Sequence, residues 1–282
     1  MSRLALGTVQ FGLDYGISNT LGQVHLKEAE KILKLAKEFG ADTLDTAPAY
    51  GVSEKILGDI GINHFQIITK TSSLHLGVDN VVQSFYQSLE DLNIPSVDGL
   101  LVHDIGEIKD KHFDDLYYEL DKLKRDKLTN KIGFSIYTPD QIDFLLDNFD
   151  FDLIQVPFNV FDNRLIDGGQ LQALKDKKIE IHARSIFLQG LLLDFKNLSD
   201  YFSEWKKEFE SYQEIVKVSG SSLLDYALHF ALNNKEIDKV LIGVNSENQL
   251  TEIIKSTKKK CYSKAYPIYD ENLLNPSKWN SS

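Results

Sequence analysis

A regular alternation of short apolar segments with longer amphipathic segments runs through almost the whole chain. It predicts parallel strands joined by right-handed helical crossovers, in a sheet that stays open or closes into a barrel. Neither glycine-rich phosphate loop, GxGxxG or GxxxxGK[ST], occurs, which argues against an open nucleotide-binding sheet. Eight strands are expected, the number that closes a (β/α)8 TIM barrel. They are residues 4–9, 42–46, 65–70, 98–103, 131–135, 152–157, 180–185 and 239–243.

The segments between the predicted strands have the spacing of amphipathic helices. In residues 26–39 apolar side chains recur at i, i+3, i+4 and i+7, and Gly40 suits the position after the last helical turn. Further helices are expected at residues 80–92, 112–124, 139–149, 169–176 and 250–256. The connection after the seventh strand is longer and is expected to hold two helices, at residues 200–218 and 221–232.

Length and composition set further limits. The 282 residues suit one barrel, so the whole chain, 1–282, is expected to form a single domain. A formal net charge of −11 disfavours a nucleic-acid partner, and no apolar run approaches the roughly 20 residues of a membrane span. The single cysteine, Cys261, excludes an internal disulfide and a multi-thiolate metal site. Without a secretory signal pattern, we expect a soluble, cytoplasmic protein that holds no metal.

Ionisable side chains follow three consecutive predicted strands. They are Asp45, Tyr50, Lys70 and His103. In such a barrel the reactive groups lie at the carboxyl ends of the strands, so these side chains are expected to meet at one rim. Each alone has an ordinary structural explanation, as a helix cap, a surface amine or a satisfied core imidazole. Together they predict a site that transfers protons, because burying all of them without partners or a role would be costly.

The chemistry of this predicted site follows from the pKa values of its groups. A phenol with a pKa of about 10 is a poor acid at neutral pH, but a neighbouring ammonium favours the phenolate. Lys70 is therefore expected to activate Tyr50 as a proton donor, and Asp45 to hold Lys70 charged and oriented. His103 is expected to donate a hydrogen bond to a substrate carbonyl oxygen, where negative charge develops.

The same residues resemble the motifs of the aldo-keto reductases. DTAPAYGVSE at residues 45–54 is similar to that family's DTAxxYGxxE motif, and LGT at 6–8 to its opening. ITK at 68–70 and LLVH at 100–103 are similar to its lysine and histidine strands, and the order agrees up to about Ser256. The resemblance, to short bacterial-type members, implies an enzyme that reduces aldehydes or ketones. It also implies that the four residues form a catalytic tetrad in which Tyr50 is the general acid.

The resemblance also assigns residues to a nicotinamide cofactor. Ser135 and Gln155 match residues that contact the carboxamide, and Arg184 stands where many members have an aromatic residue stacked on the nicotinamide. The implied set is Ser135, Gln155, Arg184, Ser185, Leu188, Gly190, Gly243, Asn245 and Gln249. NADPH is the implied cofactor. Residues 245–249 contain no Lys or Arg for a 2′-phosphate, so NADH is the alternative, and only a weak preference for NADPH is expected.

The substrate is expected to lie near the first barrel loop. Gln10, Phe11 and Tyr15 can face a small carbonyl compound there, and analogy with short bacterial-type members suggests a sugar-like one. Residues 257–282 form a C-terminal tail that is expected to pack near the substrate pocket. Beyond the small-molecule substrate no partner is expected, and the chain is expected to be a monomer or a weak homo-oligomer.

Two other functions fit part of the pattern. Lys70 could form a Schiff base in a barrel aldolase or lyase, with Asp45 and Tyr50 moving protons. That function leaves the segments around Ser135, Gln155 and 243–249 without a role. The chain could also be a cofactor-binding regulatory subunit without turnover, and the complete set of acid, phenol, amine and imidazole argues against it.

Overall fold

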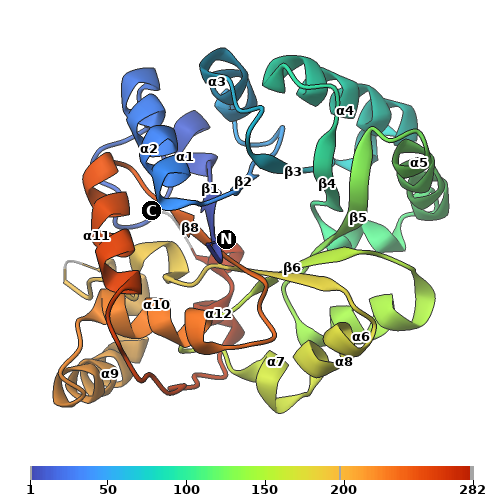
Figure 1. Ribbon diagram of the computed structural model, residues 1–282. Helices are drawn as coiled ribbons and strands as arrows, with labels where there is room; N and C mark the ends of the chain where they lie inside the picture. Colours follow the sequence, from blue (N-terminus) through green and yellow to red (C-terminus); the bar gives the residue numbers. More distant parts are fainter. Residues whose placement is uncertain (1, 197, 280–282) are drawn as a thin grey trace.

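The computed structural model describes residues 2–196 and 198–279, which form a closed barrel of eight parallel strands (Figure 1). Each strand pairs with the next in sequence, and β1 pairs with β8 to close the barrel. The strands are β1 (Leu4–Gly7), β2 (Thr43–Asp45), β3 (Gln66–Lys70), β4 (Val97–Val102), β5 (Thr129–Ser135), β6 (Leu153–Pro157), β7 (Glu180–Arg184) and β8 (Lys239–Gly243). The predicted (β/α)8 barrel is confirmed, and each strand lies within two residues of its predicted bounds.

Helices surround the barrel on its outer side (Figure 1). The α-helices are α1 (Val9–Gly12), α2 (Leu26–Phe39), α3 (Ser53–Ile60), α4 (Val78–Leu92), α5 (Phe113–Arg125), α6 (Pro139–Asn148), α7 (Arg164–Asp167), α8 (Gln170–Asp176), α9 (Lys206–Val218), α10 (Leu223–Asn233), α11 (Glu247–Thr257) and α12 (Glu271–Leu274). Short 3-10 helices lie at Leu74–Leu76, Ile105–Lys109, Leu188–Gly190, Asp200–Trp205 and Pro276–Lys278.

Local sequence signals explain where several helices begin and which face they bury. Ala29, Ile32 and Leu33 of α2 are buried against the barrel, as their spacing predicted. At the start of α6, Thr138 and Gln141 form a capping box, and Pro139 occupies the first helical position, where its missing N–H leaves no hydrogen bond unmade. The helix periodicity and the capping chemistry therefore agree with each other.

Several helical segments differ from the prediction: the short helices α1, α7 and α12 were not expected, and α11 begins three residues before the predicted 250–256. Helix α3 is present although no helix was expected between the second and third strands; it has only eight residues and contains Gly58, a poor helix former. A Cβ at position 58 would lie 2.0 Å from the Asp91 carbonyl oxygen, so this glycine allows α3 to pack directly on α4. The helix expected at residues 200–218 is divided, with a 3-10 segment at Asp200–Trp205 before α9.

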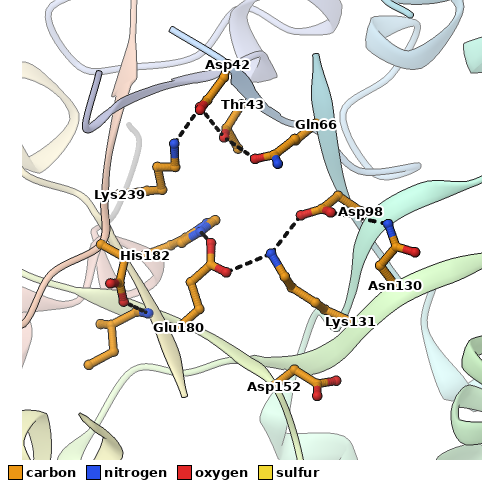
Figure 2. Close-up of polar contacts among 12 residues, drawn as sticks. Asp42, Thr43, Gln66, Asp98, Asn130, Lys131, Asp152, Glu180, His182 and Lys239 are labelled. Carbon is orange, nitrogen blue, oxygen red and sulfur yellow. Dashed lines mark hydrogen bonds and ion pairs between the residues drawn. The ribbon is translucent and has the colours of Figure 1, made fainter. Parts of the chain in front are cut away.

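A network of charged side chains lies at the amino ends of the strands (Figure 2). Lys131 of β5 lies 2.9 Å from Asp98 Oδ2 and 2.7 Å from Glu180 Oε2. Glu180 Oε1 also lies 2.8 Å from Nε2 of the fully buried His182. These contacts link β4, β5 and β7 at the amino ends of the strands, where residues of this fold contribute to stability.

This network predicts a dependence of stability on pH. The hydrogen bond from His182, followed by the ammonium of Lys131, lowers the pKa of Glu180 to about 2 from its ordinary value of about 4.5. Because the folded-state pKa is the lower one, the stabilisation is present above about pH 4.5 and is lost as the pH falls toward 2. Glu180→Gln should therefore reduce the acid sensitivity of the unfolding free energy by about 1 kcal/mol, after allowance for solvent screening. Urea titrations from about pH 6 to about pH 3 measure how the unfolding free energy changes with pH. An equal loss of unfolding free energy in both proteins would contradict the prediction.

The C-terminal tail packs against the loop between β6 and α7. The backbone amides of Tyr266 and Ile268 donate to the carbonyl oxygens of Val160 and Phe161, at 2.7 and 2.9 Å. Of the predicted tail, residues 280–282 lie outside the described residues. Within the described part of the chain, no helix is long and apolar enough to cross a membrane.

Candidate active site

A cavity of about 520 Å³ opens at the carboxyl ends of the barrel strands. All but two of the residues predicted for the site line it: Gln10, Tyr15, Asp45, Tyr50, Lys70, His103, Ser135, Gln155, Arg184, Ser185, Gly190, Gly243, Asn245 and Gln249. The two exceptions are Phe11 and Leu188, which are fully buried in the core and do not line the cavity. Among the described tail residues, 257–279, none lines it either.

An ion pair lies at the base of the cavity. Lys70, the last residue of β3, is 1% exposed, and its Nζ lies 2.7 Å from Oδ1 of Asp45, the last residue of β2. The same ammonium donates to the Thr46 carbonyl oxygen at 2.9 Å. Gln155 Nε2, from β6, donates to Asp45 Oδ2 at 2.7 Å. Both carboxylate oxygens of Asp45 are therefore satisfied, which fixes the direction of the ammonium.

Tyr50 projects over this ion pair from the loop after β2. Its ring centroid lies 4.8 Å from Lys70 Nζ and 6.0 Å from the ring centroid of His103, which it meets edge-on at 84°. A Cβ at Gly12 would lie 1.6 Å from the Tyr50 carbonyl oxygen, so α1 can approach this loop only with glycine at that position. The four ionisable residues predicted to meet at one rim thus lie together.

The environment shifts the pKa values of these groups in opposite directions. Burial raises the pKa of the Tyr50 phenol above its ordinary value, and the positive charge of Lys70 opposes that rise. Burial alone would lower the pKa of the Lys70 ammonium, but Asp45 and Tyr50 outweigh it and the pKa lies above its ordinary value. Burial, followed by the charge of Lys70, lowers the pKa of His103 to about 4. At neutral pH the group therefore holds a protonated phenol, an ammonium and a neutral imidazole.

Arg184, at the end of β7, adds a second cation to the same end of the cavity. Its guanidinium lies 4.3 Å from the centroid of the Tyr137 ring and donates to the Ile136 carbonyl oxygen at 2.8 Å and to Ser185 Oγ at 3.2 Å. Among the described residues, these hydrogen bonds go to a carbonyl and a hydroxyl oxygen and not to a carboxylate. The charge of Arg184 also opposes the rise in the pKa of Tyr50 and adds a small part to the lowering of the pKa of His103.

The loop after β7 has an unusual backbone. Ser185, Leu188 and Gln189 have positive φ angles of 57°, 44° and 52°, and Gly190 has one of 95°. Such conformations cost free energy for residues other than glycine and persist where the surroundings enforce them, commonly beside ligands. The loop borders the cavity beside the first barrel loop, from which Ser18 Oγ donates to the Gln189 carbonyl oxygen at 3.5 Å.

Several residues that line the cavity were not predicted. They are Ser18, Asn19, Tyr137, Gln189 and Glu252, among others. Tyr137 lies two residues after the end of β5, so extending the strand-end rule into the following loop would have found it. The remaining residues lie in loops and on a helix, where the strand-end rule gives no signal.

Four ionisable side chains thus meet at the carboxyl ends of the strands of a closed barrel, which is where this fold places active sites. A family model described as the aldo/keto reductase family matches residues 3–272, so the chain belongs to that family of oxidoreductases. L-galactose dehydrogenase of Arabidopsis thaliana is 29% identical over 270 residues, 88% of this chain and 83% of that protein. The aldo-keto reductase YhdN of Bacillus subtilis is 23% identical, over 91% and 85% of the two chains.

Solved structures agree on the fold. The holo form of aldo-keto reductase AKR11C1 from Bacillus halodurans superposes with a TM-score of 0.75 at 19% identity, covering 93% of this chain and 88% of that one. The glycerol dehydrogenase AKR11B4 from Gluconobacter oxydans gives a TM-score of 0.70 at 20% identity, with the same coverage. At these identities the likeness establishes the barrel fold alone.

Proposed function

We propose that the protein reduces an aldehyde or ketone to an alcohol with a nicotinamide cofactor, and that Tyr50 is the general acid. The observation that carries the proposal is the buried Lys70 ammonium, which is held by Asp45 at 2.7 Å and lies 4.8 Å from the Tyr50 ring. Burial keeps the phenol protonated, ready to donate. As the proton leaves, the adjacent ammonium stabilises the phenolate, so donation is favoured where charge develops.

His103 supplies the second donor. With a pKa of about 4 it is neutral above that pH, and a neutral imidazole carries one N–H. Edge-on beside Tyr50, it can donate to the same carbonyl oxygen without competing for the proton. The oxygen would then meet two prearranged donors, the phenol and the imidazole, as its negative charge grows.

The cavity suits a nicotinamide dinucleotide. Gln10 Oε1 lines it as a buried acceptor without a partner, which a ligand amide or hydroxyl can satisfy. We propose that Ser135 and Gln155 hold the carboxamide end, that Arg184 and Ser185 flank the ring, and that Gly190, Gly243, Asn245 and Gln249 hold the rest, with Leu188 supporting the loop from the core. When bound, the cofactor supplies the hydride to the carbonyl carbon. By resemblance the cofactor is NADPH, with NADH as the alternative.

The substrate we propose is a small, polyhydroxylated, sugar-like carbonyl compound. Two of the similar proteins are named for galactose and glycerol, which both carry several hydroxyl groups. Gln10 and Tyr15 line the cavity and offer polar groups for hydroxyls, while Phe11 supports them from the core. We expect one domain, with the tail near the pocket entrance, acting in the cytoplasm as a monomer or weak homo-oligomer.

The alternatives are less well supported. A Schiff-base lysine must lose its proton, yet Asp45 and Tyr50 keep Lys70 charged by raising its pKa. A regulatory subunit without turnover would not need the tetrad, whose members all meet in the cavity.

The test is a panel of sugar aldehydes, aliphatic aldehydes, aryl aldehydes and ketones, followed by the loss of NADPH or NADH absorbance. We expect turnover of at least one hydroxylated aldehyde or ketone, since every proposed group is present and correctly charged. Binding of cofactor without oxidation by any member of the panel would favour the regulatory subunit. Borohydride trapping of a substrate adduct on Lys70 would favour the Schiff base.

A further inference from the structure

The amino end of α11 is occupied by a carboxylate from another helix. Helices α2 and α11 pack side by side (Figure 1), and Glu28 of α2 points its side chain at the first turn of α11. Glu28 Oε1 accepts a hydrogen bond from the backbone amide of Glu247 at 2.8 Å. Since the first amides of a helix attract anions, the protein has placed its own anion where a phosphate could otherwise bind.

Neighbouring donors at this helix end are also in use. The backbone amide of Asn245 donates to Gln249 Oε1 at 2.7 Å, and that of Gln249 donates to Ser246 Oγ at 3.2 Å. Together with the Glu247 amide, three donors around the start of α11 are therefore satisfied within the chain. An incoming phosphate would have to displace these contacts to gain their hydrogen bonds.

This helix end lies where the adenosine half of a dinucleotide would be held. The tetrad lines the cavity from β2, β3 and the segments after β2 and β4, whereas Asn245, Gln249 and Glu252 line it from the loop after β8 and from α11. If the proposed function is correct, the nicotinamide lies at the tetrad, so the adenosine ribose and any 2′-phosphate lie beside the start of α11. NADH and NADPH differ only in that phosphate.

The charges around this end are unfavourable to a phosphate dianion. The backbone amide of Glu247 and then Lys31 lower the pKa of Glu28, so its carboxyl is ionised at neutral pH. Lys31 Nζ lies 3.1 Å from Glu28 Oε2 and is thereby engaged. Glu247 and Glu252 add further negative charge to the same turns of α11. The basic residues that line the cavity, Lys70 and Arg184, lie at the ends of β3 and β7.

We propose, on the basis of the function proposed above, that Glu28 is a specificity-determining residue that selects the cofactor without a 2′-phosphate. The protein then binds NADH in preference to NADPH, which reverses the weak preference expected from the resemblance. One carboxylate facing a dianion at the protein surface accounts for roughly a tenfold difference in affinity, and added salt reduces it.

The experiment is a titration of the full chain with NADH and with NADPH, followed by the fluorescence of the bound cofactor. The wild type should bind NADH about tenfold more tightly than NADPH. Glu28→Gln keeps an acceptor for the Glu247 amide but removes the charge. It should tighten NADPH binding about tenfold and leave the Kd for NADH within about twofold. Glu38→Gln, which removes an exposed carboxylate at the other end of α2, should change neither Kd.

Any of the following results would overturn the inference. Wild-type binding of NADPH as tight as that of NADH would remove the preference itself. Equal weakening of both cofactors by Glu28→Gln would assign Glu28 a merely structural role at the start of α11. If neither dinucleotide binds to the wild type, the proposed function fails as well, whereas a clear NADPH preference overturns only the assignment to Glu28.

Discussion

Tyr50→Phe should lose carbonyl reduction by about 10³-fold in kcat while its Kd for the cofactor stays within about twofold of the wild type. The change removes one hydroxyl and its transferable proton and retains the ring that lies 4.8 Å from Lys70 Nζ and edge-on to His103. No other side chain of the tetrad can replace that proton, because the imidazole is neutral and the ammonium is held by Asp45. Steady-state kinetics and cofactor titration on the same preparation measure both quantities.

Tyr15→Phe is the matched comparison, because it removes a second phenol from the same cavity. Tyr15 is proposed to face the substrate, so its loss should raise KM by severalfold and change kcat little. If Tyr50→Phe kept wild-type kcat, or if Tyr15→Phe lost as much of it, the assignment of Tyr50 as the general acid would be wrong.

The sequence was sufficient to predict the fold and the convergence of the four ionisable residues at one rim, for the same physical reason. Parallel strands buried on both sides must be apolar throughout, so a polar residue at the end of one is conspicuous. Asp45 and Lys70 end β2 and β3, and His103 directly follows β4, as the apolar segments before them indicated. Since the eight strands of this barrel are parallel, their three carboxyl ends had to meet at one rim.

Contacts that join distant segments could not be predicted in this way. Glu28 lies on a helix whose only visible signal is amphipathic spacing, and its contact with Glu247 depends on how β1 and β8 close the barrel. Helix α3 was missed because propensity penalises Gly58, whereas the packing of α3 on α4 requires it. Both features depend on packing between segments that are distant in the sequence, which the local residue pattern does not indicate.

The sequence predicted the location of Arg184 but not its contacts. The resemblance placed it in the cavity beside the cofactor, and it lines the cavity. In the structure it also stacks on Tyr137 and donates a hydrogen bond to the Ile136 carbonyl oxygen, and neither contact was predicted. An arginine at a strand end has many accessible directions, so its position is set by the neighbours it finds.

Lys70→Met is expected to have the largest effect on stability. It leaves the Asp45 carboxylate, 3% exposed, with Gln155 as its remaining side-chain partner. Removing one member of a buried ion pair costs about 3–5 kcal/mol, because the other charge stays buried without compensation. Carbonyl reduction should also fall by about 10²-fold or more, since the phenolate of Tyr50 loses its adjacent cation. Urea denaturation and steady-state kinetics measure the two losses.

The double change Lys70→Met with Asp45→Asn separates the two roles of the lysine. Because the amide of asparagine carries no charge, most of the lost stability should return, to within about 1–2 kcal/mol of the wild type. Activity should not return, because nothing in the double variant stabilises the Tyr50 phenolate. Recovery of activity together with stability would mean that Lys70 acts only by holding β2 and β3 in place. Failure of stability to recover would mean that the loss in the single variant comes from packing of the lysine stem and not from the uncompensated Asp45 charge.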